Sequence, residues 1–135
     1  ILNHMRGTPE TWAKQPPLPD VMGAVAADLD AAVHRARRAG VDRARIMLDP
    51  GLGFGKRKEQ NAEILARLPE LSRLDLPIMA VSYTHLRAEE TEFSSAAAVA
   101  AAILNGAHMV RVHDVKLIAA AVRLSDMVLR NSPQD

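Results

Sequence analysis

The sequence contains no cysteine, so the chain has neither a disulfide framework nor a thiolate metal site. Aromatic residues are also scarce, at 3% of the chain. Proteins that bind single-stranded nucleic acid stack its bases on aromatic side chains, and such a platform is not expected here. The net charge is only +1, which argues against a general nucleic-acid or membrane-binding surface.

Long hydrophobic runs are missing too. The longest clean apolar run, Ala96–Leu104, is far shorter than the roughly 20 residues that cross a bilayer. No leader segment is recognisable at the first residues, and a cytoplasmic location is expected. At 135 residues, of which 48% are hydrophobic, the chain is long enough for one domain with a buried core.

What the chain has is a regular alternation of short β-type runs and longer helical patterns. Strands are predicted at Ile1–Met5, Arg45–Leu48, Pro77–Val81 and His108–Val112. Helices are predicted from Asp20, their capping residue, to Gly40, over Ala62–Leu71, over Ala96–Asn105, and after Asp114, with Leu117, Ala121, Leu124 and Val128 facing inward. Four βα units in succession predict an α/β fold with a parallel sheet.

Three short motifs fall where a predicted strand passes into a loop. They are HMRGTP (His4–Pro9), DPGLGFGK (Asp49–Lys56) and RVHDV (Arg111–Val115). The carboxyl ends of parallel strands meet at one edge of a sheet, and α/β proteins build their small-molecule sites there. The motifs therefore predict one shared site for a small molecule.

Asp49 is the first candidate in that site. At a strand end, with a buried body and an exposed carboxylate, it can accept two parallel N–H bonds from a 2-aminopyrimidinone or a similar ring. The alternative is an ordinary helix-capping aspartate. Gly51, Gly53 and Gly55 follow it, and they allow a tight turn and a close approach to a ligand. Their spacing matches neither a Walker loop nor GxGxxG.

Arg111 and His113 alternate with two valines, so on a strand both side chains point to the same face. On the interior face of a barrel or sheet, an unpaired charge is costly. A phosphate or pyrophosphate bound between them would compensate the charge. The alternative is a buried Arg111 paired with Asp49 or Asp114.

A metal site is the remaining interpretation of these strand ends. His4, His113, Asp49 and Asp114 are all ligand types that metal-dependent barrels use. No local ligand spacing such as HExxH supports that interpretation, and no metal ligand is assigned.

Taken together, the three motifs resemble dihydropteroate synthase, the folate-pathway enzyme that sulfonamides inhibit. Their order and spacing fit, as do LDLPIMAVS (Leu74–Ser82) and ILNGAH (Ile103–His108), and the resemblance covers almost the whole chain. It implies a TIM (β/α)8 barrel. It also implies a transferase that joins p-aminobenzoate to 6-hydroxymethyl-7,8-dihydropterin diphosphate and releases pyrophosphate with Mg2+.

The resemblance also implies which residues bind these small molecules. Asp49 resembles the aspartate that holds the pterin ring, and Met5 resembles an apolar residue of the pterin pocket. Gly53 and Phe54 resemble the loop that borders pterin and p-aminobenzoate. Arg111 resembles the arginine that stacks on the pterin, and it would form the anion site for the diphosphate with His113.

Two departures from the family are visible. The resemblance extends only to the second half of the family, so residues 1–135 are expected to form a partial pterin-binding domain, truncated on its N-terminal side. Four βα units would be half of a barrel, and the fragment is expected to be inactive alone. The family's Mg2+ ligand lies in the missing half. In addition, Tyr83–Ala88 (YTHLRA) replaces the family's SRK motif and resembles translated sequencing-adapter DNA, which suggests a chimeric insertion.

The alternative function is a non-catalytic pterin- or anion-binding half-barrel that forms a homodimer. Two copies would complete eight strands and cover the open sheet edges. A half-barrel with only a structural role is a third possibility. In each case no nucleic-acid or membrane partner is expected.

Overall fold

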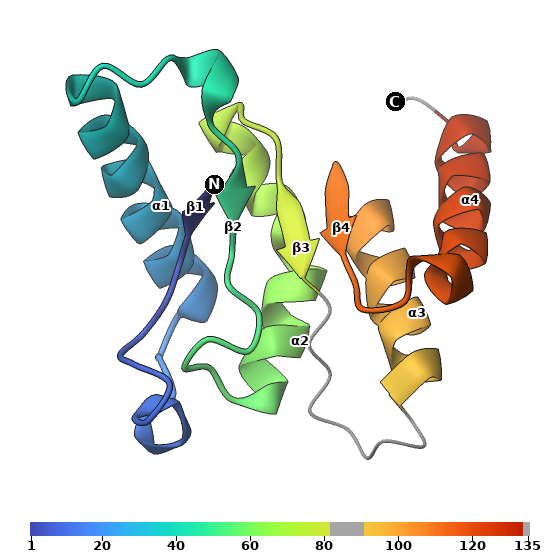
Figure 1. Ribbon diagram of the computed structural model, residues 1–135, viewed down its shortest axis with the longest axis horizontal. Helices are drawn as coiled ribbons and strands as arrows, with labels where there is room; N and C mark the ends of the chain where they lie inside the picture. The colour runs from blue at the N-terminus through green and yellow to red at the C-terminus, as the bar shows by residue number, and fades with distance from the viewer. Residues whose placement is uncertain (82–90, 134–135) are drawn as a thin grey trace.

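The computed structural model describes residues 1–81 and 91–133. The segment Tyr83–Ala88, for which a chimeric origin was suggested, lies outside the described residues. Figure 1 shows the strands at the centre of the molecule, with α1 at one end of the arrangement and α4 at the other.

Four short parallel strands form the sheet. β1 (Leu2–Asn3) pairs with β2 (Leu48–Asp49), and β3 (Met79–Val81) pairs with β4 (Met109–Arg111). A parallel bridge between Leu48 and Ile78 connects the two pairs, so the strand order is β1-β2-β3-β4. The four predicted βα units and their parallel arrangement are confirmed.

Each strand is followed by a helix. The α-helices are α1 (Val21–Arg38), α2 (Lys58–Ala66), α3 (Thr91–Leu104) and α4 (Val115–Asn131), and the 3-10 helices are η1 (Trp12–Lys14), η2 (Arg43–Arg45) and η3 (Leu68–Leu74). Asp20 and Asp114 accept hydrogen bonds from the backbone N–H groups of Gly23 (3.0 Å) and Leu117 (2.9 Å), which confirms both predicted caps. Among the described residues, no helix is long and apolar enough to cross a membrane.

Several predicted boundaries were wrong. The predicted strand Arg45–Leu48 begins as the 3-10 turn η2, because the Asp42 side chain accepts from the Ala44 N–H and starts a turn there. The predicted helix Ala62–Leu71 is two elements, α2 and η3. Pro69 lies in the first turn of η3, and it has no N–H to continue the α-helical bonding of α2.

The core has two parts. The larger cluster joins α1, β2, α2, η3 and the start of β3 through fully buried side chains such as Val25, Leu48 and Leu71. The smaller cluster joins α3 and α4 beneath β4, around Val99 and Ile118. The helices α1 and α2 thus pack in one cluster, and α3 and α4 pack in the other.

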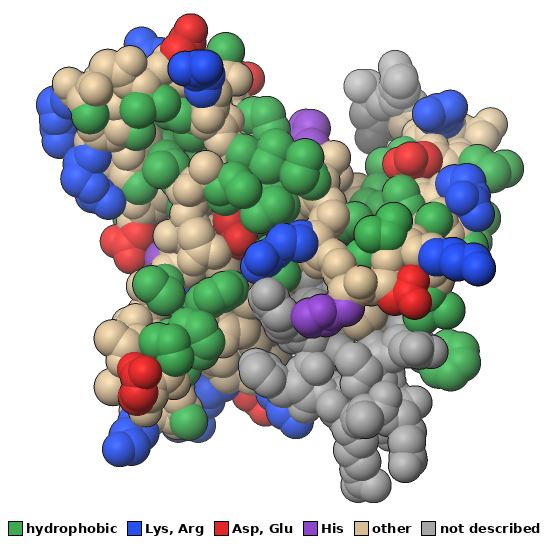
Figure 2. All heavy atoms as spheres, viewed as in Figure 1, with side chains coloured by type: hydrophobic (Ala, Val, Ile, Leu, Met, Phe, Trp, Pro, Cys, Tyr) green, Lys and Arg blue, Asp and Glu red, His purple; other side chains and the backbone are tan. Residues whose placement is uncertain are grey.

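The predicted inward face of α4 was wrong. Leu117, Leu124 and Val128 are exposed, at 45%, 62% and 47%, and the fourth predicted residue, Ala121, is half-buried, whereas Ile118 and Ser125 are buried. The buried line is displaced by one residue, a rotation of about 100° around the helix axis. The cause is the neighbour: α4 packs on α3, and its second apolar stripe remains at the surface, where Figure 2 shows hydrophobic side chains over the α4 region.

Candidate functional site

The register of the strands places the motif residues on one face of the sheet. Asn3 is level with Asp49, and Leu48 is level with Ile78, so Asp49 lies beside Met79. Leu48 and Ile78 belong to the helix-side core, and successive strand residues point to opposite faces. Asn3 and Asp49 therefore face away from the helices, at the carboxyl edge of the sheet.

Arg111 ends β4 on that same face. It is level with Val81, two residues beyond Met79, which lies beside Asp49. Strands lie about 4.8 Å apart and rise about 3.3 Å per residue, so the Cα atoms of Asp49 and Arg111 are about 12 Å apart. In Figure 2, acidic, basic and histidine side chains are visible near the centre of the view, over the strand ends.

Asp49 itself is more enclosed than expected. Its side chain was predicted to have an exposed carboxylate, but the residue is 2% exposed. One carboxylate oxygen accepts from Asn3 Nδ2 at 2.8 Å, and the other accepts from the Gly51 backbone N–H at 2.7 Å. The alternative interpretation as a helix cap was also wrong, because α2 begins after Arg57. Asn3 was missed as a site residue. Its alternation with Met5 in the predicted strand Ile1–Met5 was the available signal.

The glycine loop after β2 turns as predicted, with positive φ angles of 68°, 82° and 71° at Gly51, Gly53 and Gly55. The close approach that requires glycine is to β1. A Cβ at Gly51 would lie 1.8 Å from the His4 carbonyl oxygen, and one at Gly55 would lie 2.3 Å from that of Arg6. The loop is thus pressed against the strand that carries Asn3.

Lys56 ends the glycine loop and is buried beneath it, with 8% exposure. Its Nζ donates to the carbonyl oxygens of Gly51 (2.5 Å), His4 (3.3 Å) and Phe54 (3.4 Å). Burial lowers its pKa to about 8, while the Asp49 carboxylate opposes that change. Lys56 belonged to the recognised motif but was not predicted to act in the site. A lysine directly after a glycine loop was the signal.

His4 lies under the same loop, 3% exposed, on the helix side of β1. Its Nε2 is 3.3 Å from a carboxylate oxygen of Asp28 on α1, and its Nδ1 has no hydrogen-bond partner. Burial, and then the Lys56 charge, lower its pKa to about 4 despite the opposing effect of Asp28. His4 is therefore neutral at pH 7 and faces away from Asp49.

Gly53 and Phe54 form the tip of the glycine loop. The Gly53 N–H donates to the Asn61 side chain of α2 at 3.0 Å. The Phe54 ring meets the Trp12 ring of η1 edge to face, with 4.9 Å between centroids. Trp12 thus connects the loop after β1 to the loop after β2.

Met5, Arg111 and His113, the other expected site residues, are exposed. A buried Arg111 was one of the two interpretations of RVHDV, and that interpretation was wrong. Asp114, its suggested partner, caps α4. Arg111 ends β4, the last strand of the described sheet.

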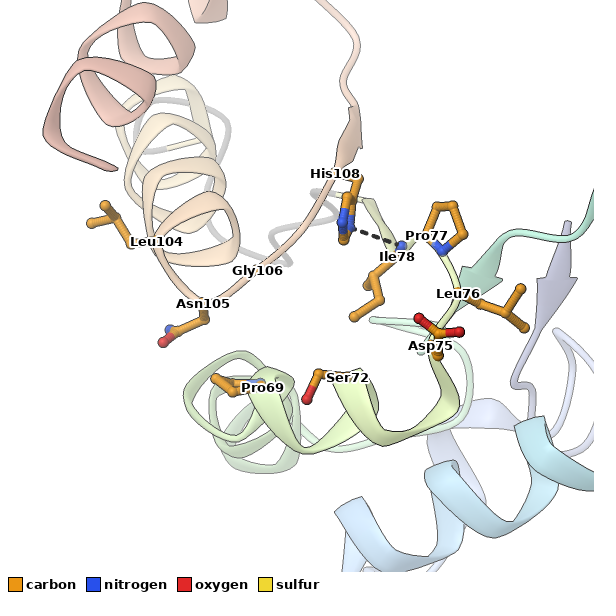
Figure 3. A pocket seen from close by; sticks show the side chains of 10 residues that line it. All are labelled: Pro69, Ser72, Asp75, Leu76, Pro77, Ile78, Leu104, Asn105, Gly106 and His108. Carbon is orange, nitrogen blue, oxygen red and sulfur yellow. Dashed lines mark hydrogen bonds between the residues drawn. The ribbon is translucent and has the colours of Figure 1, made fainter. Parts of the chain in front are cut away.

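A cavity of about 570 Å3 lies at the opposite end of the strands (Figure 3). Residues of η3, of the segment before β3 and of the α3–β4 turn line it. His108 Nδ1 accepts there from the Ile78 N–H at 3.3 Å. Asp49 and the other five expected substrate-binding residues are not among its lining residues. The motifs therefore do not converge on this cavity.

A metal centre is not formed by the part of the chain that the structure describes. No three His, Asp or Glu side chains gather there closely enough to hold an ion. His4 and Asp49, two of the candidate ligands, lie on opposite faces of the sheet.

Comparison with known families decides the relationship. The model of the pterin-binding enzymes matches residues 1–113, which include all six expected substrate-binding residues. The chain belongs to this family.

Its relatives in the pterin-binding family are dihydropteroate synthases. That of Escherichia coli K12 is 34% identical over 136 residues, covering 95% of this chain and 48% of that protein. A Yersinia pestis dihydropteroate synthase, solved in complex with a sulfonamide drug, superposes with a TM-score of 0.90 at 28% identity, over 97% of this chain and 51% of its own. A Xanthomonas albilineans synthase with 4-aminobenzoic acid gives 0.84 at 31% identity, over 98% and 49%. The chain spans about half the length of these relatives.

Proposed function

We propose that the chain is half of a (β/α)8 barrel and carries the pterin- and diphosphate-binding part of a dihydropteroate synthase. One observation carries this proposal. A buried carboxylate, Asp49, stands at the carboxyl edge of a parallel sheet, and both of its oxygens are held in place by Asn3 and Gly51. The strand order β1-β2-β3-β4 and the half-length match to the synthases support it.

The pterin ring would bind to Asp49. Each carboxylate oxygen accepts one protein hydrogen bond and has lone-pair capacity left for a second. A pyrimidinone N–H and the neighbouring amino group match that pair of acceptors. Met5, exposed two residues beyond Asn3, would supply an apolar contact to the ring.

The diphosphate would bind to Arg111 and His113. As the bond between the pterin methylene and the diphosphate breaks, negative charge gathers on the leaving group, and a guanidinium there stabilises it. The p-aminobenzoate nitrogen then attacks the methylene, with Gly53 and Phe54 bordering both rings. Positioning and electrostatics contribute most of the catalysis, and little proton transfer is asked of the protein.

Mg2+ is implied by the family resemblance as a companion of the diphosphate. The described residues do not fit a protein site for it, so no step is derived through the ion. A cytoplasmic location likewise stays a prediction.

Catalysis by this chain alone is not expected. A complete barrel of this type needs about 250 residues, and these four units supply one side of the cavity. We propose that the 135 residues bind the pterin weakly and do not turn over.

Calorimetric titration with 6-hydroxymethylpterin, and with its diphosphate, tests the binding proposal. Asp49→Asn should weaken both ligands at least about tenfold, because hydrogen bonds to a charged group are lost. Arg111→Ala should weaken the diphosphate more than the unphosphorylated pterin, because the diphosphate also loses its anion contact. Asp126→Asn and Arg130→Ala, both on the exposed side of α4, are matched controls. Unchanged affinity in Asp49→Asn would reject the proposed site.

Release of pyrophosphate in the presence of p-aminobenzoate tests catalysis. The chain should give the same rate as buffer. Turnover that disappears in Arg111→Ala would show that half of the barrel suffices, contrary to the proposal.

The homodimeric, non-catalytic module remains a second candidate because of one observation. α4 presents exposed apolar side chains, of which Leu117, Leu124 and Val128 form one row along the helix; the others are Val115, Met127 and Leu129. A second copy could cover this row and pair with an open sheet edge. Light scattering after size-exclusion chromatography should then give a dimer that Leu124→Lys converts to monomer. A monomer in the unaltered chain would reject this candidate.

A further inference from the structure

We propose that Lys56 is a positioning residue of the pterin site, whose ammonium group holds the glycine loop in the shape that orients Asp49 and Phe54. This inference rests on the proposed function, because Asp49 and Phe54 matter as substrate contacts. Lys56 itself is buried and its Nζ is bonded to backbone carbonyl oxygens, so it is assigned no substrate contact.

The contacts of Lys56 fit a role in holding the loop, and we call its bonds to the carbonyl oxygens of His4, Gly51 and Phe54 the clamp. An ammonium group has three N–H donors, and three carbonyl oxygens lie within 3.5 Å of Nζ. One belongs to His4, directly after β1, and the other two belong to Gly51 near the start of the loop and to Phe54 at its tip. A single side chain therefore ties two points of the loop to the segment after β1.

The clamp acts on both parts of the site. Gly51 accepts from Lys56 through its carbonyl and donates its N–H to Asp49 at 2.7 Å, so this one residue links the cation to the pterin-binding carboxylate. Phe54 accepts from Lys56 through its carbonyl, while its ring packs on Trp12. Loss of the ammonium would release both residues.

The charge around Lys56 makes this clamp sensitive to pH. Arg6 and His4 face it from the β1 segment, Asp49 faces it from β2, and Asp28 on α1 lies behind His4. The pKa of Lys56 is lowered to about 8, whereas that of His4 is about 4. Raising the pH through 8 therefore removes a donor from Lys56 and leaves His4 neutral.

Trp12 provides a readout that needs no ligand. It is the single tryptophan of the chain, and its ring contacts Phe54. Acrylamide quenching of Trp12 in the full chain should increase between pH 7 and pH 9 with a midpoint near 8. Lys56→Met should be quenched strongly at all pH values in this range, and the exposed Lys58→Met should behave like the unaltered chain. A pH-independent response of the unaltered chain would overturn the inference, even if Lys56→Met fails to fold.

Binding of 6-hydroxymethylpterin at pH 7 is the second arm. Lys56→Met should raise the Kd about tenfold, the loss expected for one or two hydrogen bonds from a charged group, while far-UV circular dichroism stays unchanged. Equal affinity in a folded Lys56→Met would overturn the inference. If the unaltered chain binds no pterin, the proposed function fails, and the quenching experiment still decides whether Lys56 holds the loop.

Discussion

Acid should destabilise this protein through His4 in particular. The residue is buried on the helix side of β1, and its pKa is lowered from 6.5 to about 4. In the unfolded chain it would titrate near 6.5. Between these two values the unfolded chain binds more protons than the folded protein, so the free energy of unfolding decreases as the pH falls.

The size of the effect follows from the two pKa values. One pKa unit corresponds to about 1.4 kcal/mol, so the full loss below pH 4 is about 3 kcal/mol. At pH 5 most of it is already present, about 2 kcal/mol relative to pH 7. For a domain whose total stability is roughly 5–15 kcal/mol, this is a large fraction.

Urea unfolding followed by Trp12 fluorescence at pH 7 and pH 5 measures this loss. His4→Gln removes the titrating group. Between pH 7 and pH 5, its free energy of unfolding should therefore decrease by about 2 kcal/mol less than that of the unaltered chain does. His34→Gln is the matched control, because this histidine lies on α1 with a 68% exposed side chain. It should keep the full pH dependence.

The measured quantity is the change in the free energy of unfolding between pH 7 and pH 5 within one variant. The cost of substituting a buried side chain is present at both pH values and therefore cancels. The prediction is refuted if His4→Gln and the unaltered chain lose the same stability between pH 7 and pH 5. That result would mean that the carboxylates account for the acid response and that the protein tolerates a charged His4 beside Lys56.

Three further substitutions test the loop, a cap and the carboxylate. Gly51→Ala should lower the free energy of unfolding by more than about 3 kcal/mol, because backbone strain adds to a clash with the His4 carbonyl. Gly40→Ala is the control: its φ is 87° but nothing lies near its Cβ position, so it should cost only about 1 kcal/mol, and equal costs would refute the clash. Asp114→Ala should destabilise by about 1 kcal/mol through loss of the α4 cap, and no change in the urea midpoint would contradict it. Asn3→Leu should weaken 6-hydroxymethylpterin binding about tenfold in calorimetry without unfolding the chain, because Asp49 loses its lateral hydrogen bond; unchanged affinity would remove Asn3 from the site.

The sequence was sufficient for the order of the elements because each strand and helix has local signals. Asp20 and Asp114 cap α1 and α4 as predicted, since capping depends on residues two or three positions away. The face of α4 was not predictable in the same way. Leu117 and Ile118 begin two apolar stripes with the same helical spacing, and only the position of α3 decides which one is buried.

The site residues also differ in whether a local sequence pattern or a long-range contact identifies them. Asp49 stood out because it ends a strand before three glycines, a local pattern. Its partner Asn3 lies 46 residues earlier, and the two meet only through the register of β1 on β2. The contacts of Lys56 depend on how the loop folds back on β1, which spacing does not encode. Long-range pairing was thus the part that the sequence left open.

The division of the core into two clusters sets a condition on the proposed site. Asp49 ends β2, whose Leu48 belongs to the cluster around α1 and α2, whereas Arg111 ends a strand that packs on α3 and α4. The two parts are joined by the ladder of β3 with β4 and by the contact of α2 with α3. A ligand that binds Asp49 and Arg111 together would span this junction and stabilise the pairing of β3 with β4. The pterin diphosphate should therefore raise the unfolding temperature more than the unphosphorylated pterin does at equal saturation, since only the diphosphate reaches both clusters.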